Sequence, residues 1–117
     1  MDAGRGGSGL AAPANGTVVL VRFPFSDLSA SKLRPAVVMA QASRDDVILC
    51  QITSQAYTDS SAIEIRTSDF ESGNLNRISY ARPSKLFTAN SSLIEKSVAI
   101  LTIERFAVVR DAVRALF

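Results

Sequence analysis

The hydrophobic and polar positions of the chain alternate in short runs, and their period changes only near the C-terminus. Apolar, β-branched runs at residues 17–23, 34–40 and 47–54 have the length and composition of β-strands. The alternating residues 62–66 fit a half-exposed strand. Residues 78–88 predict one bent strand or two short ones, broken at Pro83, because proline cannot donate to a sheet ladder.

Polar segments between these runs predict the connections. Residues 24–33 and 55–61 are expected to be loops, residues 41–46 a turn, and residues 67–76 a turn-rich connection centred on Gly73. The first fifteen residues are rich in Gly, Ala and Ser and show no periodicity. We therefore predict a flexible leader at 1–15 and one domain at 16–117.

Near the C-terminus the apolar residues recur at helical spacing, at Ile103, Phe106, Val109 (or Val108), Val113 and Leu116. Thr102 is a suitable N-cap, and Glu104 places a negative charge in the first turn. This pattern predicts a helix from residue 102 to about residue 116. Together with the strands it predicts a mainly β protein, a small, strongly bent sheet or barrel that the C-terminal helix closes from one side.

Polar side chains interrupt two of the predicted strands at places that suit a binding site. With a period of two, Val47 and Leu49 share a face with Gln51 and Thr53, so this face turns polar towards its C-terminal end. Proline favours extended geometry in the residue before it, so Arg34 is expected where a loop meets the sheet, a position suited to binding an anion. The alternatives are an ordinary surface arginine and a threonine chosen for its β-propensity.

Composition narrows the possible chemistry. The chain carries 13 Lys and Arg against 11 Asp and Glu, a net charge of +2, which does not by itself indicate a nucleic-acid binder. Acidic residues gather before a basic stretch at Arg77, Arg82 and Lys85, so one face is expected to be locally positive. Histidine is absent, which removes the usual general base and the commonest zinc ligand.

The cysteine count and the length of the apolar stretches bear on disulfide formation and on location in the cell. Cys50 is the single cysteine, so no disulfide forms within the chain. No apolar stretch approaches the length that spans a membrane, and the start lacks a secretory hydrophobic region. We predict a cytoplasmic protein without a metal or cofactor.

Two segments resemble a known family. Residues 16–25, Gly-Thr-Val-Val-Leu-Val-Arg-Phe-Pro-Phe, followed by Arg-Pro-Ala-Val-Val at 34–38, resemble the opening of MazF/PemK-type toxins. Gln-Ile-Thr-Ser-Gln at 51–55 resembles that family's second motif, and the similarity extends from Gly16 to the C-terminus. Some relatives carry a Gly-x-Glu segment before the arginine, where this chain has Ser-Ala-Ser-Lys-Leu at 29–33.

The resemblance implies an SH3-like barrel of the MazF/CcdB/Kid type, a homodimer, a cognate antitoxin, and metal-independent cleavage of single-stranded RNA. The family's catalytic arginine and threonine correspond to Arg34 and Thr53. We expect further RNA contacts from Lys32, Ser54, Gln55, Arg82 and Lys85. For Arg82 and Lys85 the alternative is a solvated face. Tyr80 and Phe87 are candidates for base stacking, with core packing as the alternative for Phe87.

This chemistry does not need a histidine. RNA is cleaved when its 2′-hydroxyl attacks the adjacent phosphate, which leaves a cyclic phosphate. The larger contributions of a protein to this reaction are alignment of the attack and stabilisation of charge on the phosphoryl oxygens. A guanidinium at Arg34 suits two phosphate oxygens, and the Thr53 hydroxyl suits a positioning role. Two other functions stay open: a non-catalytic relative that poisons a protein such as gyrase, and a degenerate member that only binds RNA. Gyrase-poisoning relatives depend on a C-terminal tail with tryptophan, whereas this chain has none and ends Ala-Leu-Phe.

Overall fold

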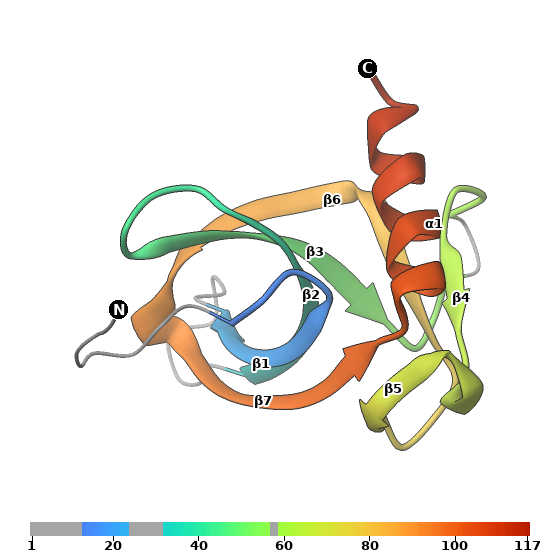
Figure 1. The fold of residues 1–117 in the computed structure, drawn as a ribbon, viewed down its shortest axis with the longest axis horizontal. Coiled ribbons are helices and arrows are strands. Elements are labelled where there is room, and N and C mark those ends of the chain that lie inside the picture. Colours follow the sequence, from blue (N-terminus) through green and yellow to red (C-terminus); the bar gives the residue numbers. More distant parts are fainter. Residues whose placement is uncertain (1–12, 24–31, 57–58) are drawn as a thin grey trace.

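The computed structural model describes residues 13–23, 32–56 and 59–117 (Figure 1). The predicted leader up to residue 12, most of the predicted loop at 24–33 and residues 57–58 of the next loop lie outside the described residues.

The described residues form a single antiparallel sheet of seven strands with one α-helix. The sheet curls into a half-barrel, and helix α1 lies beside its β4–β6 end (Figure 1). The strand order is β4-β6-β3-β2-β1-β7-β5. The strands are β1 (Thr17–Phe23), β2 (Lys32–Gln41), β3 (Asp46–Thr53), β4 (Ile63–Ile65), β5 (Phe70–Gly73), β6 (Ser79–Asn90) and β7 (Ile94–Leu101), and the helix is α1 (Ile103–Arg114). Two 3-10 turns, η1 (Thr67–Asp69) and η2 (Ser91–Leu93), precede β5 and β7. The predicted mainly β fold with a C-terminal helix is confirmed.

Both faces of the curled sheet carry buried apolar side chains. One face contributes Val18, Val37, Cys50 and Ile52 to a cluster that Val109 of α1 completes. The other face holds a second cluster, composed of Val19, Val21, Ala36, Val38, Val47, Leu49 and Ala89. The predicted division of residues 47–54 between two faces is therefore confirmed, and the alternation fixes which side chains point to each side.

Helix α1 begins as its sequence predicts. The Thr102 hydroxyl accepts a hydrogen bond from the Arg105 backbone N–H at 3.1 Å, and Val109 in the middle of the helix is fully buried. The helix ends at Arg114, before the predicted end near residue 116, and Leu116 beyond it is 49% exposed. At the other end Ile103 is 79% exposed. Only the central turns of the helix therefore pack on the sheet.

The structure corrects several predicted boundaries. Strand β2 begins at Lys32, which pairs with Phe23, so Arg34 lies inside the strand and not at its start. Strand β5 forms within the predicted turn-rich connection, and β7 has no counterpart among the predicted strands. Strand β5 pairs with β7, and β7 pairs with β1 as well, so both strands depend on distant segments that local patterns do not reveal.

Residues 78–88 were predicted to bend at Pro83, and β6 does bend there. Its pairing with β3 shifts between Cys50↔Leu86 and Ile52↔Ala81, so residues 82–85 form an irregular stretch within one continuous strand. Arg82 lies in this kink, and its side chain donates to Gln51 of β3.

Gly73 provides a test of the β5–β7 edge. Its φ is +72°, and a Cβ added there would lie 2.2 Å from the Val98 carbonyl oxygen and 2.6 Å from the Ala99 Cα. Because these are backbone atoms of the neighbouring strand, we expect Gly73→Ala to lower the free energy of unfolding by at least about 2 kcal/mol in urea denaturation.

Gly16→Ala is the matched control. Gly16 also has a positive φ, +92°, but the nearest atom to an added Cβ is 3.6 Å away, on the Phe106 ring. This variant shares the conformational strain and lacks the clash, so it should be less destabilised. Equal losses in the two variants would contradict the clash at the sheet edge.

Candidate functional site

Arg34 and Thr53 lie on neighbouring strands, at one end of the same sheet face. Arg34 pairs with Val21 of β1, and Ala36 pairs with Gln51 of β3. Following the β2–β3 register two residues beyond this pair places Arg34 opposite Thr53. Deeper in the sheet this face carries the cluster with Ala36, whereas Arg34 is exposed and Thr53 is half-buried. The face therefore changes from core to accessible surface at these two residues.

Two further strands extend this row of side chains. Thr53 pairs with Tyr80 of β6, and Tyr80 pairs with Glu64 of β4. Since directly paired residues of antiparallel strands project to the same face, Tyr80 stands next to Thr53 on the side away from Arg34. Arg34, Thr53 and Tyr80 thus supply a guanidinium, a hydroxyl and an aromatic ring in one row.

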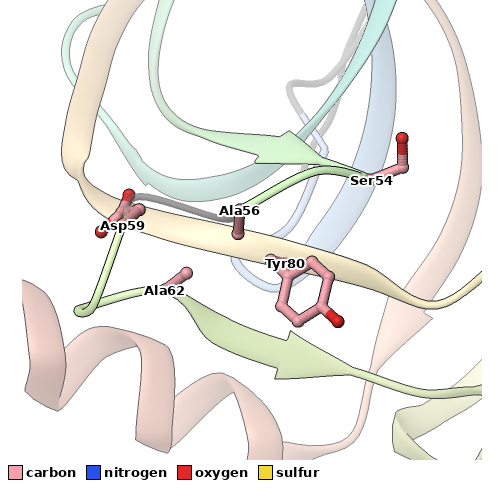
Figure 2. A pocket seen from close by; sticks show the side chains of 5 residues that line it. All are labelled: Ser54, Ala56, Asp59, Ala62 and Tyr80. Carbon is pink, nitrogen blue, oxygen red and sulfur yellow. The ribbon is translucent and has the colours of Figure 1, made fainter.

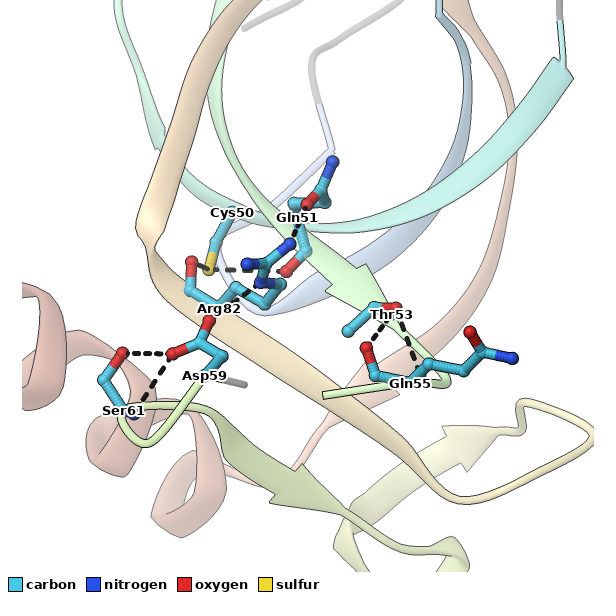
Figure 3. Close-up of polar contacts among 7 residues, drawn as sticks. All are labelled: Cys50, Gln51, Thr53, Gln55, Asp59, Ser61 and Arg82. Atoms are coloured by element: carbon cyan, nitrogen blue, oxygen red, sulfur yellow. Dashed lines mark hydrogen bonds and ion pairs between the residues drawn. The ribbon is translucent and has the colours of Figure 1, made fainter. Parts of the chain in front are cut away.

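The hydroxyl of Thr53 is held by its own chain. Thr53 Oγ1 donates to the Gln55 carbonyl oxygen at 3.0 Å and accepts from the Gln55 backbone N–H at 3.1 Å (Figure 3). Both bonds belong to a local turn of the type that threonine favours. A hydroxyl oxygen has two lone pairs, so one remains to accept a hydrogen bond from a ligand.

A cleft of about 370 Å³ lies beside Thr53. Its lining comes from the segment between β3 and β4 and from β6, at Ser54, Ala56, Asp59, Ala62 and Tyr80 (Figure 2). In this view Ser54 and Asp59 lie at opposite ends of the lining, with Ala56 and the Tyr80 ring between them. The cleft thus offers small side chains, the Asp59 carboxylate and one aromatic ring, and it reaches Ser54, the residue after Thr53.

Arg82 connects the cleft to β3. Its Nε donates to Asp59 Oδ2 at 2.8 Å, and its Nη1 donates to Gln51 Oε1 at 3.2 Å (Figure 3). Asp59 Oδ1 accepts from both the backbone N–H and the hydroxyl of Ser61, at 3.1 and 2.7 Å. The sequence prediction placed Arg82 on RNA and gave Asp59 no role, because the two residues are 23 positions apart and no spacing pattern links them.

Two groups near the site have shifted pKa values. The Arg82 hydrogen bond, followed by that of the Ser61 hydroxyl, holds the pKa of Asp59 below its usual 3.8. Burial raises the pKa of Cys50 to about 11, and its thiol donates to the Arg82 carbonyl oxygen at 3.2 Å. Cys50 is therefore a neutral core residue, whereas Asp59 is ionised at neutral pH.

The other predicted RNA contacts lie around this row. Lys32 is exposed two residues before Arg34, and Ser54 and Gln55 are exposed directly after Thr53. Lys85 is exposed in the irregular stretch of β6. Phe87 packs against the second apolar cluster, which supports core packing.

Neither a metal site nor a membrane span is found among the described residues. No three His, Cys, Asp or Glu side chains in this part of the chain gather so that they could hold a metal ion. Within it, no helix has the length and apolar character needed to cross a membrane.

Comparison with known families identifies the class of protein. The model for the PemK-like, MazF-like toxin of type II toxin–antitoxin systems matches residues 14–117. The chain therefore belongs to this family, and the resemblance seen in its motifs is confirmed. A comparison with curated proteins gave no match.

Solved structures share the fold. A MazE–MazF structure from Deinococcus radiodurans is 19% identical with a TM-score of 0.70, covering 89% of this chain and 94% of that one. A mycobacterial endoribonuclease in complex with its cognate antitoxin is 15% identical with a TM-score of 0.65, covering 91% and 93%. The Mycobacterium tuberculosis toxin MazF-mt6 is 12% identical with a TM-score of 0.66, covering 85% and 93%. At these identities the structures establish the common fold.

The depressed pKa of Asp59 predicts a pH-dependent stability. Because the folded pKa lies below the unfolded value, the ionised carboxylate contributes stability that is fully present above about pH 4 and is lost as the pH falls through the folded pKa. Asp59→Asn should therefore have a lower Tm than the wild type at neutral pH, and the difference should shrink in acid. Thermal melts between about pH 7 and pH 2 measure it.

Arg82→Gln provides the control background for this measurement. Because Arg82 is the main cause of the shift, adding Asp59→Asn to Arg82→Gln should change the Tm much less than it does in the wild type. A difference between wild type and Asp59→Asn that stays constant down to the lowest pH would contradict the assignment.

Proposed function

We propose that this protein is the toxin of a toxin–antitoxin pair and cleaves single-stranded RNA at Arg34 and Thr53 without a metal ion. The observation that carries the proposal is the register that brings these two residues together on adjacent strands, at the accessible end of one sheet face. Membership of the PemK-like, MazF-like family supports the same conclusion. An mRNA substrate places the proposed activity in the cytoplasm.

In the proposed reaction the 2′-oxygen of one nucleotide attacks the adjacent phosphorus, and the bond from phosphorus to the 5′-oxygen breaks. The products are a 2′,3′-cyclic phosphate and a 5′-hydroxyl, so the 2′-hydroxyl loses one proton and the leaving oxygen gains one. Negative charge grows on the phosphoryl oxygens during this step. The Arg34 guanidinium presents several N–H donors in one plane and suits two of these oxygens at once.

Thr53 has a positioning role in this proposal. Its proton is donated to the Gln55 carbonyl oxygen, so the oxygen acts towards RNA as an acceptor. The remaining lone pair can accept the hydrogen bond of the 2′-hydroxyl and hold the attacking oxygen in line with the bond that breaks. An ordinary threonine hydroxyl is a weak base, so we assign it alignment and not proton abstraction.

The surroundings fit a path for the RNA strand. Lys32 is an exposed cation two residues before Arg34 on β2, Lys85 is an exposed cation on β6, the strand next to that of Thr53, and Ser54 and Gln55 add polar groups after Thr53. We propose that the lysines contact phosphates and that the Tyr80 ring stacks on a base, a contact worth about 1–3 kcal/mol. Arg82 already donates to Asp59 and Gln51, so it is less available to a phosphate than the lysines.

We also propose two protein partners. Apolar side chains are exposed at the β7–α1 junction and at the chain end, where Ile100 is 40%, Ile103 79% and Phe117 98% exposed. A second copy of the chain would cover such surface in a symmetric pair. We propose further that an extended acidic and apolar segment of a cognate antitoxin covers Arg34 and Thr53 and blocks RNA by charge and occupancy.

Replacing Arg34 tests the nuclease directly. In EDTA, wild type should cut a long single-stranded RNA into discrete fragments ending in cyclic phosphate. Arg34→Ala should be slower by about 100-fold or more, because charge on the phosphoryl oxygens loses its donors. Arg34→Lys should recover only part of the rate, since lysine lacks the planar fork. Unchanged cleavage by pure, folded Arg34→Ala would contradict the assignment.

Thr53 offers a matched pair of variants for the same assay. Thr53→Ser keeps the hydroxyl and should retain much of the rate, whereas Thr53→Val keeps the β-branched shape and removes the acceptor. Equal rates in the two variants would show that the hydroxyl has no part in cleavage.

The homodimer is tested by sedimentation velocity at micromolar concentration. Wild type should sediment as a dimer, and Ile103→Glu should shift it towards the monomer because a charge would be buried in the apolar contact. Ser92→Glu, an exposed position on η2, is the control. A strictly monomeric wild type would contradict the proposed dimer.

A further inference from the structure

Gln51, Asp59 and Arg82 together form a connection that the proposed cleavage step leaves without a role. We call these three residues the Arg82 clamp. Arg82 lies in the kink of β6, Gln51 on β3, and Asp59 in the segment between β3 and β4 (Figure 3). One guanidinium therefore ties together three parts of the chain: β6, β3 and the segment between β3 and β4.

The Asp59 end of the clamp belongs to the cleft. The Asp59 side chain is only 9% exposed, and the residue lines the cleft together with Tyr80 and Ser54. Its two oxygens receive bonds from Arg82 and Ser61, which hold the carboxylate in one orientation. Asp59 is the part of the cleft lining that we call the cleft wall, and its bond with Arg82 anchors it to β6.

The Gln51 end belongs to the strand that carries Thr53. Gln51 precedes Thr53 by two residues and shares its face, and Gln51 pairs with Ala36, two residues after Arg34. The Arg82 Nη1 bond thus reaches the strand position next to the proposed catalytic pair. The clamp joins the cleft wall to this position through one rigid, planar group.

A role in RNA binding alone fits these contacts poorly. The Arg82 side chain is 25% exposed, and its Nε and Nη1 both donate to protein oxygens. Its charge is balanced by Asp59 at 2.8 Å, so its field towards a phosphate is weaker than that of an exposed lysine. The geometry favours a role in which Arg82 acts through Asp59 and Gln51.

We propose that the Arg82 clamp positions the cleft wall relative to Thr53 and thereby determines which nucleobase is accepted beside the scissile phosphate. This inference rests on the proposed function. The cleft would take one base of the RNA strand, with the Tyr80 ring as its stacking surface and small residues, Ala56 and Ala62, around it. Arg82 and Asp59 are positioning residues, and the clamp sets the size and orientation of the space between them and Thr53.

The test compares Asp59→Asn, Arg82→Gln, the double variant and wild type on one long RNA and on a short RNA with the preferred site. We expect each single variant to lower kcat/KM on the preferred site by about tenfold or more and to cut at additional sequences, because a displaced wall aligns the substrate less well. The double variant should lose no more than the worse single variant, since both break one connection. Arg82→Lys should restore part of the selectivity.

Asp69→Asn is the matched control. Asp69 forms another partly buried ion pair, with Arg105 at 3.2 Å, and it joins η1 to the helix α1. This variant should lower the Tm while leaving the cleavage pattern and kcat/KM unchanged. Asp69→Asn therefore separates loss of stability from loss of selectivity. If the Arg82 clamp only stabilised the fold, variants with the same fall in Tm would lose the same selectivity.

Three results would overturn the inference. The first is wild-type rate and cleavage pattern in both single variants. The second is losses that multiply in the double variant, which would make the two residues independent. The third is a loss of kcat/KM in Asp69→Asn as large as that in Asp59→Asn at a similar fall in Tm, because the loss would then follow stability alone. If wild type itself cleaves no RNA, the proposed function fails first, and the failure is visible before any variant is compared.

Discussion

The register of β1, β2 and β3 decides which side chains reach the accessible end of the sheet. A slip of one residue would exchange the two faces of a strand, and both faces of this sheet are buried against apolar clusters. Val37 and Cys50 belong to one cluster, and Ala36 and Leu49 belong to the other. Each cluster is packed from particular side chains, so the packing of the two clusters holds the register, and the register places Arg34 next to Thr53.

The proposed chemistry follows from what this arrangement holds still. A chain without histidine lacks the side chain that most often transfers protons near neutral pH. Alignment and charge stabilisation therefore contribute the larger part of the proposed rate enhancement. Gln55 fixes the Thr53 hydroxyl from the following turn, and the β-ladder fixes the backbone of Arg34. Each reacting group would meet a partner that the fold has already oriented.

Local patterns predicted the features that depend on neighbouring residues. The Thr102 cap, the two faces of β3 and the bend at Pro83 all follow from side chains within a few positions of one another. The Arg-Pro and Thr-Ser-Gln motifs identified the family and suggested Arg34 and Thr53, whose catalytic roles stay predictions. Strands β5 and β7 and the link from Arg82 to Asp59 require contacts between distant segments, which no local pattern encodes.

The most direct measurement is a crystal structure with an RNA whose attacking 2′-hydroxyl is replaced by hydrogen, so that the strand binds without being cut. We expect the phosphate after this nucleotide to lie between the Arg34 guanidinium and Thr53, with N–H donors of Arg34 on its oxygens. A phosphate bound elsewhere, touching neither Arg34 nor Thr53, would contradict it.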